Sequence, residues 1–342
     1  MAWSMDTQAT MMSVAQRIGP DGVQMAIVDT ISYKTPFIEE GYWHEANDFN
    51  SHHFLQVVSK PVGTDSVANK GIAWEQAVTR PLTEPIQGLE VYSRIDIRIL
   101  GRERDPEAFR SAQALLDASG LKVTFHDRML YGNNSIYPAQ VNGLFTRYPN
   151  LTNPVTGLPQ PNVTDNGGRI GNAQSSTWAV KWGLDGLFFV YPRGGQGWIT
   201  SDDMGVQLVP DDQNLTPARE YRALVTCMGI HFGVCAGDDR CVQRLANIDA
   251  TATWNPNAQM NALGLFPDDN YDNVVLYVPR RVWQQMNQSA ANKTNVVLSW
   301  GEAWGGPVVF FFTVPTRMCE RIYPITTQVA GVATIQYEPV AS

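Results

Sequence analysis

Charged residues are scarce in this sequence. Asp, Glu, Lys and Arg make up 17% of the chain, below the quarter or so that is typical of soluble domains. The net charge is −8 and no long run of Lys or Arg occurs, which disfavours a general nucleic-acid binder, because phosphate contacts need clustered basic side chains. With 44% hydrophobic residues over 342 positions, the chain can bury a substantial core in one large domain or in two to three smaller ones.

Paired cysteines and long apolar runs are also missing. The four cysteines form no C-x-x-C pair, which argues against zinc ribbons and thioredoxin-like chemistry, and we expect free thiols. No stretch reaches the ~18 apolar residues of a membrane span, so no membrane association is expected. The N-terminus has neither the basic start nor the apolar segment of a signal peptide, so we interpret the six Asn-x-Ser/Thr triplets as polar loops.

The sequence HEANDFNSHH at 44–53 is the densest group of candidate metal ligands, with three of the five histidines. Zinc hydrolases place two histidines four residues apart on a helix, and His44 has no such partner. His52 and His53 are adjacent and would point to opposite faces of a strand. The interpretation we favour is a polar turn ahead of a strand. The alternative is a metal-dependent enzyme that uses His44, Glu45, His52 and His53.

No other catalytic constellation emerges. The glycine-rich sequence YPRGGQG at 191–197 lacks the Gly-Lys-Ser/Thr of a P-loop, and no Gly-x-Ser-x-Gly elbow occurs. The ten tryptophans would suit a glycan-binding protein of a virion or cell surface, or a structural protein with large buried interfaces. We therefore predict no catalytic residue, no cofactor and no metal, and we expect that the protein is not an enzyme.

A long helix is the strongest regular element. In the sequence RDPEAFRSAQALLDASGLKVTFHDRML, Asp105 is the expected N-cap, Pro106 the first helical residue, and Gly132 a suitable end. Apolar residues recur every seven positions and predict a packed face of this helix: Phe109, Leu116, Val123 and Leu130.

Strand patterns surround the helix. Residues 52–100 predict a long two-stranded excursion with a polar tip, and its end alternates apolar and polar residues from Val91 to Ile99. The sequences TWAVKWG and GLFFVYP flank LDG, which predicts a hairpin. A buried strand in DNVVLYVP precedes a helix that begins near Pro279, and GPVVFFFTVPTRMCERI and GVATIQY are strand-like. A short helix is expected within TQATMMSVAQRI. The fold class is α+β.

The ordered set of segments resembles the major capsid proteins of tailed bacteriophages with the Hong Kong 97-type fold, and more narrowly the GP-seven family of short-tailed phages. EANDFNSHHFLQVVSKP resembles the family's entry into its extended loop, and EVYSRID the approach to its spine helix. AFRSAQALLDASGLKVTFHDRMLYGN resembles the spine helix. GLFTRYPN, SSTWAVKWGLDGLFFVYPRGGQGW and RLANID are similar to its central domain, and VLYVPRRVWQQM and VPTRMCERI extend the likeness.

The resemblance implies an architecture. It consists of an N-terminal arm (1–48), an extended β-hairpin loop with flanking strands (49–98), a spine helix of the peripheral domain (99–132), an axial domain (133–312) and strands that return to the peripheral domain (313–342). It also implies contact residues in the extended loop: Val62, Asp65, Lys70, Trp74 and Arg80. The family-like axial motif comprises Trp178, Trp182, Gly183, Tyr191, Pro192, Arg193 and Gly194.

The function implied is that of a major capsid protein. It would assemble with itself into the hexamers and pentamers of an icosahedral head that encloses double-stranded DNA, with only non-specific proximity to that DNA. A portal, a separate scaffold chain and a decoration protein are the other partners expected, and no membrane is. The location implied is the virion shell, assembled in the cytoplasm of a bacterial host.

Overall fold

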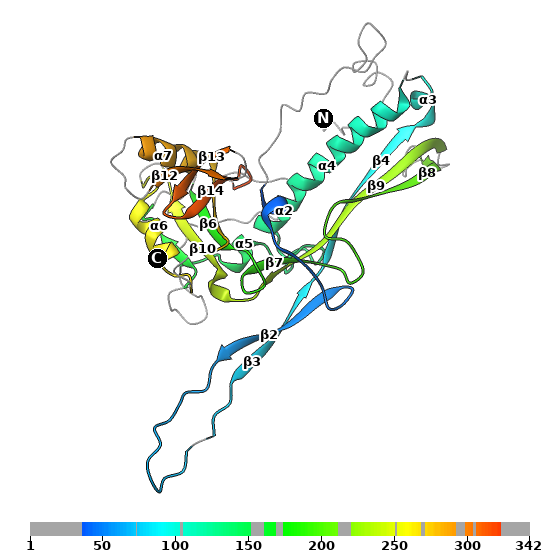
Figure 1. The fold of residues 1–342 in the computed structure, drawn as a ribbon. Coiled ribbons are helices and arrows are strands. Elements are labelled where there is room, and N and C mark those ends of the chain that lie inside the picture. The colour runs from blue at the N-terminus through cyan, green and yellow to red at the C-terminus, as the bar shows by residue number, and fades with distance from the viewer. Residues whose placement is uncertain are drawn as a thin grey trace. The chain divides into compact units, whose positions relative to one another are not determined.

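The computed structural model describes residues 36–72, 74–102, 105–151, 161–168, 174–210, 220–249, 252–267, 271–291, 298–303 and 306–322 (Figure 1). The described chain forms two compact units. Unit 1 takes its described residues from Gly88–Phe125 and Trp198–His231, and unit 2 from Lys34–Gln87, His126–Gly197 and Phe232–Ser342. The helix expected in TQATMMSVAQRI and the strand expected in GVATIQY lie outside the described residues. Within the described parts of the chain, no helix is long and apolar enough to cross a membrane.

The predicted long helix is confirmed as α4, Pro106–Tyr131, with 26 residues. Asp105 Oδ1 accepts the backbone N–H of Ala108 at 3.1 Å, which satisfies one of the free donors at the helix start. At the other end of the helix, the backbone N–H of Gly132 donates to the carbonyl oxygen of Arg128 at 2.9 Å. A Cβ at Gly132 would lie 2.3 Å from the carbonyl oxygen of Val141, so only glycine fits here.

The buried face of α4 differs from the predicted one. Phe109 and Leu130 are buried, but Leu116 and Val123, which were expected in the core, are only half-buried. The deeply buried residues towards the end of the helix are Leu121, Phe125 and Met129, which recur every four residues. A strict repeat of seven drifts by about 20° per heptad around a helix of 3.6 residues per turn. The seven-residue repeat therefore marks a partly covered side of α4. Only its first and last residues, Phe109 and Leu130, are buried in a core.

Unit 1 contains β4 (Gln87–Asp96), α3 (Ile97–Leu100), β8 (Thr200–Pro210) and most of β9 (Glu220–Ala236). β9 pairs with β8 in antiparallel register and also neighbours β4. Phe109 of α4 packs on Ile95 and Ile99. The predicted alternation is present in β4 but ends at Asp96, before the expected Ile99, because the Asp96 carboxylate accepts the N–H of Arg98 at 2.8 Å and starts a helical turn.

Unit 2 is built on a seven-stranded sheet of described strands. Its order is β12 (Leu298–Ala303), β13 (Gly306–Phe311), β14 (Val314–Met318), β11 (Val274–Val278), β6 (Ser175–Lys181), β10 (Val242–Ile248) and β5 (Val163–Asp165). Helix α6 (Pro256–Leu263) packs on β10 and β5, and α7 (Arg280–Ala291) on β12, β13 and β14. The strand and helix predicted around Pro279 are thus confirmed as β11 and α7. A short 3₁₀ turn, Asp239–Cys241, precedes β10.

The hairpin predicted around LDG is wrong. β6 lies between β10 and β11 in the seven-stranded sheet, whereas β7 (Leu187–Tyr191) pairs with β9 and with β1 (Trp43–Glu45). Gly183, two residues after β6 ends at Lys181, has φ 143°, a conformation that few other residues tolerate. The local turn signal was correct, but both strands have partners from distant parts of the sequence instead of each other.

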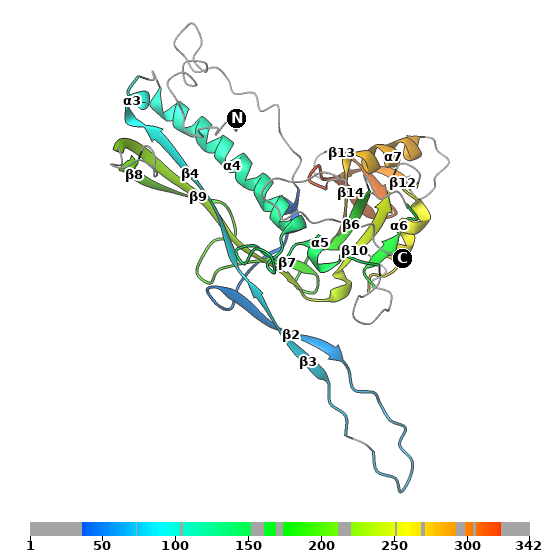
Figure 2. The same cartoon turned by 180° about the vertical axis from the view of Figure 1, so that it is seen from behind.

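The predicted two-stranded excursion is confirmed over Ser51–Pro85, whereas the alternating end expected within it forms β4, which pairs with β9 instead. β2 (Ser51–Ser59) and β3 (Val78–Pro85) pair antiparallel from Ser51↔Pro85 to Ser59↔Val78. Figures 1 and 2 show the two strands side by side, with the chain between them forming one long connecting loop. The four cysteines are free, as expected.

The packing of α4 makes a direct prediction. We expect Phe125→Ala to lower the free energy of unfolding by about 3–5 kcal/mol, because the ring is fully buried and its removal leaves a cavity. Leu115→Ala on the same helix is the matched control, since Leu115 is 72% exposed and should change stability by less than about 0.5 kcal/mol. Urea denaturation of the purified subunit measures both. Equal effects would contradict the assignment of the buried face.

Candidate assembly interface

The β2–β3 hairpin exposes apolar side chains that a folded chain usually covers. Leu55 is 68% exposed and Trp74 fully exposed. The others with large exposed fractions are Val57, Val58, Val62, Val67, Ile72 and Val78. An isolated two-stranded hairpin is marginally stable in water, and contiguous exposed apolar surface marks an interaction site. This hairpin therefore has the character of a surface that is completed by another molecule.

All five predicted contact residues of the extended loop are exposed: Val62, Asp65, Lys70, Trp74 and Arg80. Arg80 donates to Gln56 Oε1 across the hairpin at 2.5 Å, and the N–H of Val62 donates to Glu75 Oε2 at 2.6 Å. These contacts are local to the hairpin. The positions of the five residues make them available to a partner, and whether they contact one stays a prediction.

An ion pair fixes the root of the hairpin. Glu84 of β3 accepts two hydrogen bonds from Arg147, at 2.9 and 2.8 Å. Arg147 belongs to α5 (Leu144–Arg147) and also donates to the carbonyl oxygens of Asn142 and Val234, at 3.0 and 2.9 Å. Both side chains are largely buried. A bidentate pair has one favoured orientation, so it holds β3, α5 and the end of β9 in a fixed arrangement.

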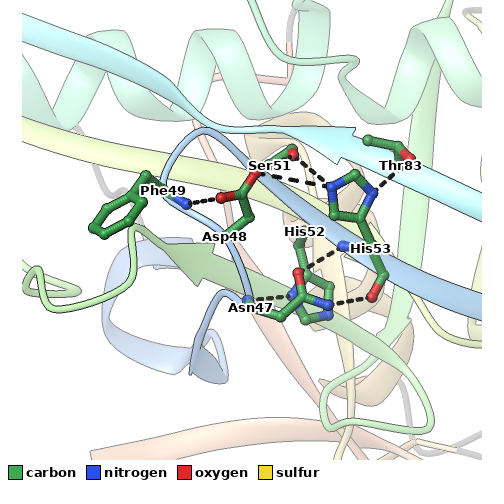
Figure 3. A network of polar contacts seen from close by, with 7 residues as sticks. All are labelled: Asn47, Asp48, Phe49, Ser51, His52, His53 and Thr83. Carbon is green, nitrogen blue, oxygen red and sulfur yellow. Dashed lines mark hydrogen bonds and ion pairs between the residues drawn. The ribbon is translucent and has the colours of Figure 1, made fainter.

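The histidine-rich stretch forms the turn that leads into β2 (Figure 3). The Asn47 side chain accepts the N–H of His53 at 2.9 Å and donates to the His53 carbonyl at 2.6 Å. The His53 ring lies 3.0 Å from Ser51 Oγ and 2.9 Å from Thr83 Oγ1 on β3. Asp48 Oδ1 accepts the N–H of Phe49 at 2.8 Å. The predicted polar turn ahead of a strand is confirmed.

His52 and His53 lie on opposite faces of β2, as predicted. His52 is buried, and its ring packs edge-on against Phe188 and His44, with centroids 5.8 and 6.0 Å away. Its Nδ1 accepts the N–H of Asn47 at 3.4 Å. Burial lowers the pKa of His52, and the nearby His44 and His53 lower it further, since each disfavours a second positive charge.

Metal binding finds no support in this turn. Within the described ranges, no three His, Cys, Asp or Glu side chains are grouped so that they could hold a metal ion. His44 and His52 face each other through their rings, while His53 points to the other side and bonds to hydroxyl groups. These histidines are therefore used in packing and in hydrogen bonds of the chain itself.

A second anchor lies at α2 (Phe37–Glu40). Phe37 is fully buried, and its ring packs on Tyr277 and His126 with centroids 4.2 and 5.5 Å away. Glu40 accepts a hydrogen bond from the Tyr277 hydroxyl at 2.8 Å and another from Arg317. Desolvation raises the pKa of Glu40 against the opposing effect of Tyr277 and Arg317. The segment that leads to β1 is thus tied to β11 and β14.

The residues of the axial motif do not form a single site. Trp178 is buried in β6, and Trp182 donates its indole N–H to the Tyr277 hydroxyl at 2.8 Å. Gly183 lies two residues after the end of β6. The remaining four, Tyr191, Pro192, Arg193 and Gly194, follow or end β7, and the N–H of Gly194 donates to Glu45 Oε1 at 2.8 Å. The motif therefore combines a core position with a turn beside β1.

Among the buried charged groups that were not predicted are Arg244, Asp127 and Arg321. Arg244 of β10 donates to Ser176 Oγ and to the carbonyl oxygens of Tyr148 and Pro149, and it stacks over the rings of Phe145 and Trp178. A charged residue inside the apolar stretch around β10 was the available signal.

The other two groups form an ion pair. Asp127 of α4 accepts from Arg321, with Nε to Oδ1 at 2.8 Å, and both side chains are buried. No local pattern links residues 194 positions apart. The pair ties the segment after β14 to the end of the long helix.

The long helix beside a β-sheet, the extended hairpin and the separate mixed α/β unit together define the capsid-subunit fold of tailed phages. The structure is similar to that of bacteriophage Epsilon15, with a TM-score of 0.74 and 19% identity, over 95% of this chain and 98% of that one. It is also similar to the capsid of bacteriophage JBD30, with a TM-score of 0.51 and 10% identity, over 88% of this chain and 95% of that one. No curated protein matches the sequence.

The sequence model of the family described as Major capsid protein GP7 matches residues 19–330, and the chain belongs to that family. It is a major capsid protein that forms phage heads from copies of itself, and its place is the capsid shell of the virion. It is a structural protein, not an enzyme.

The Glu84–Arg147 pair predicts how the hairpin root responds to substitution. We expect Glu84→Ala to destabilise the subunit by about 3–5 kcal/mol, because it leaves a buried guanidinium without its counter-charge. Hydrogen exchange of β2 and β3, together with urea denaturation, measures the effect. Gln56→Ala, which removes an exposed hydrogen bond within the same hairpin, should change little. A similar loss in both variants would show that the pair does not fix the root.

His52 predicts a pH dependence of the same region. Because its pKa is lowered in the folded chain, its contribution to stability is fully present above about pH 6.5 and is lost as the pH falls through the lowered value. We expect the thermal midpoint of the subunit to drop between pH 7.5 and 5, and to drop less in His52→Asn, whose amide oxygen can replace Nδ1 as the acceptor. His53→Asn, at an exposed position, should drop as the wild type does. An unchanged pH profile in His52→Asn would contradict this role.

Proposed function

We propose that the subunit builds hexamers and pentamers of an icosahedral head that encloses double-stranded DNA, with the β2–β3 hairpin lying on a neighbouring copy. The observation that carries the proposal is the row of exposed apolar side chains along the hairpin, from Leu55 to Val78. Their burial against a second copy would contribute about 25 cal/mol for each Å² removed from water. Because each hairpin is held at its root by Glu84 and Arg147, it can extend from its own subunit without internal packing.

Strand β8 carries a second exposed apolar surface, which supports assembly in which each subunit contacts several others. On β8, the apolar residues Met204, Val206 and Leu208 alternate along the strand and are all exposed. β8 pairs only with β9 among the described strands, so it has a free edge as well as an apolar face. Exposed edges and faces of this kind are sites where chains associate. We propose that β8 contacts another copy in the shell, and contacts that repeat over a lattice reinforce one another.

We propose that unit 1, with the long helix and β4, is the peripheral domain, and that the seven-stranded sheet of unit 2 is the axial domain. The range 133–312 expected for the axial domain includes Trp198–His231, which groups with the long helix in unit 1. The proposed axial domain is therefore interrupted in sequence. Residues 1–48 would form the arm, 49–98 the extended loop with its flanking strands, 99–132 the spine helix, and 313–342 the return to the peripheral domain.

The remaining partners follow from the proposed role in a DNA-filled head. A portal, a scaffold chain and a decoration protein would act as separate molecules during or after assembly in the bacterial cytoplasm. The net charge of −8 suits a wall that lies near packaged DNA without binding it strongly, because like charges repel.

Shortening the hairpin tests the proposal. Ser59 and Val78 face each other in register, so residues 60–77 can be replaced by Asn-Gly, which favours a two-residue turn. We expect a folded subunit with a normal circular dichroism spectrum that forms no closed shells by electron microscopy. The matched control is Leu184→Ser, at an exposed apolar residue outside the hairpin, which should assemble normally. Normal shells from the shortened chain would refute the role of the hairpin.

A further inference from the structure

We infer that His126 is a proton-sensitive latch that holds α2, and with it residues 36–42 before β1, against the core of unit 2. The backbone N–H of Phe37 donates to His126 Nε2 at 3.0 Å, and both residues are fully buried. A backbone N–H can only donate. The Nε2 atom must therefore carry a lone pair, so the ring is neutral and its single proton is on Nδ1.

Protonation of the His126 ring removes the hydrogen bond between its Nε2 atom and the N–H of Phe37. The imidazolium ion has N–H groups at both nitrogens and no acceptor. Its Nε2–H would then face the N–H of Phe37, which leaves a buried donor without a partner and places a positive charge in the interior. Opening of α2 away from the ring relieves both effects, so proton uptake and opening are coupled.

Two buried carboxylates of the segments that form the latch already have cationic partners. On α2, Glu40 is already engaged by Arg317 of β14 and by the Tyr277 hydroxyl of β11. On α4, Asp127 is already engaged by Arg321. Glu39 stands beside Glu40 in α2, Lys122, Arg128 and Tyr131 lie within five residues of His126 in α4, and Cys319 and Glu320 precede Arg321. The Glu40 and Asp127 carboxylates are each paired with an arginine.

The hydrogen bonds of Glu40 and Phe37 give the latch two parts with different pH behaviour. The Glu40 contacts pair a carboxylate with Arg317 and the Tyr277 hydroxyl, and burial raises the pKa of that carboxyl against their opposing effect. The Phe37 contact depends on a neutral histidine, whose ordinary pKa is about 6.5. A single proton on His126 therefore removes the Phe37 contact directly. The consequence for assembly rests on the proposed function: if the segment before β1 reaches neighbouring copies, its release would loosen the contacts between subunits.

Hydrogen–deuterium exchange of the unassembled full-length chain tests the latch. We expect the protection factor of a peptide that covers α2 to fall about tenfold between pH 7.5 and 5.5, since one proton taken up on opening changes the equilibrium about tenfold per pH unit below 6.5. A peptide that covers β11 should keep its protection and serves as the internal reference. Constant protection of α2 over this range would overturn the inference.

His126→Gln separates the latch from other titrating groups, because its amide oxygen can accept the Phe37 N–H at any pH. We expect α2 in this variant to stay protected at both pH values, and in His52→Asn to lose protection as the wild type does. An equal pH-dependent loss in His126→Gln would overturn the inference.

The protonation of His126 can also be measured directly in the wild-type chain, which provides a test even if His126→Gln does not fold. Deuterium exchange at the imidazole C2 position reports the protonation of each histidine. We expect His126 to take up its proton over the pH range in which α2 loses protection, and a protonated His126 beneath a protected α2 would overturn the latch. Failure of the chain to form shells would refute the proposed function and leave this result, obtained on unassembled subunits, standing.

Discussion

A two-stranded hairpin with exposed apolar faces is marginally stable alone, and its position on this subunit depends on how its root is fixed. The Glu84–Arg147 pair supplies that constraint, because its bidentate geometry joins β3 to α5 and to the last residues of β9. The buried His52 and the turn around Asn47 support the other strand. Hydrogen bonds and an ion pair with defined geometry therefore fix the root of the hairpin. Side-chain packing cannot fix the exposed strands in the same way, because most of their large apolar side chains are exposed.

Buried ionic and polar groups join several pairs of distant segments in unit 2. Glu40 with Arg317, and Asp127 with Arg321, attach α2 and the segment after β14 to the core, and Arg244 binds the carbonyl oxygens that follow α5. Such groups add little net stability compared with apolar packing, but breaking one of them is costly. They favour one arrangement of the connecting segments, which suits a subunit that must present the same surfaces in every copy of a shell.

Several features were predictable because their causes are local. Asp105, Pro106 and Gly132 define the ends of α4 through capping and backbone geometry, and alternation in β2 and β4 follows from the pleat of a strand. The polar turn at Asn47 was also predictable, since spacing excluded a helical metal site. The core face of α4 was not predictable, because the burial of Leu121 and Phe125 depends on the segments that pack on them. The partners of β6 and β7 were not predictable either, because they come from distant parts of the sequence.

The sequence by itself determined the ends of the long helix, the scarcity of charge and the resemblance to phage capsid proteins, because capping residues, composition and family-like segments are local properties of the chain. The tertiary structure decided which residues act together. Glu84 and Arg147 are 63 positions apart, and Phe37 and His126 are 89 apart. No short-range pattern links such residues, since only the folded chain brings a donor within hydrogen-bond distance of its acceptor.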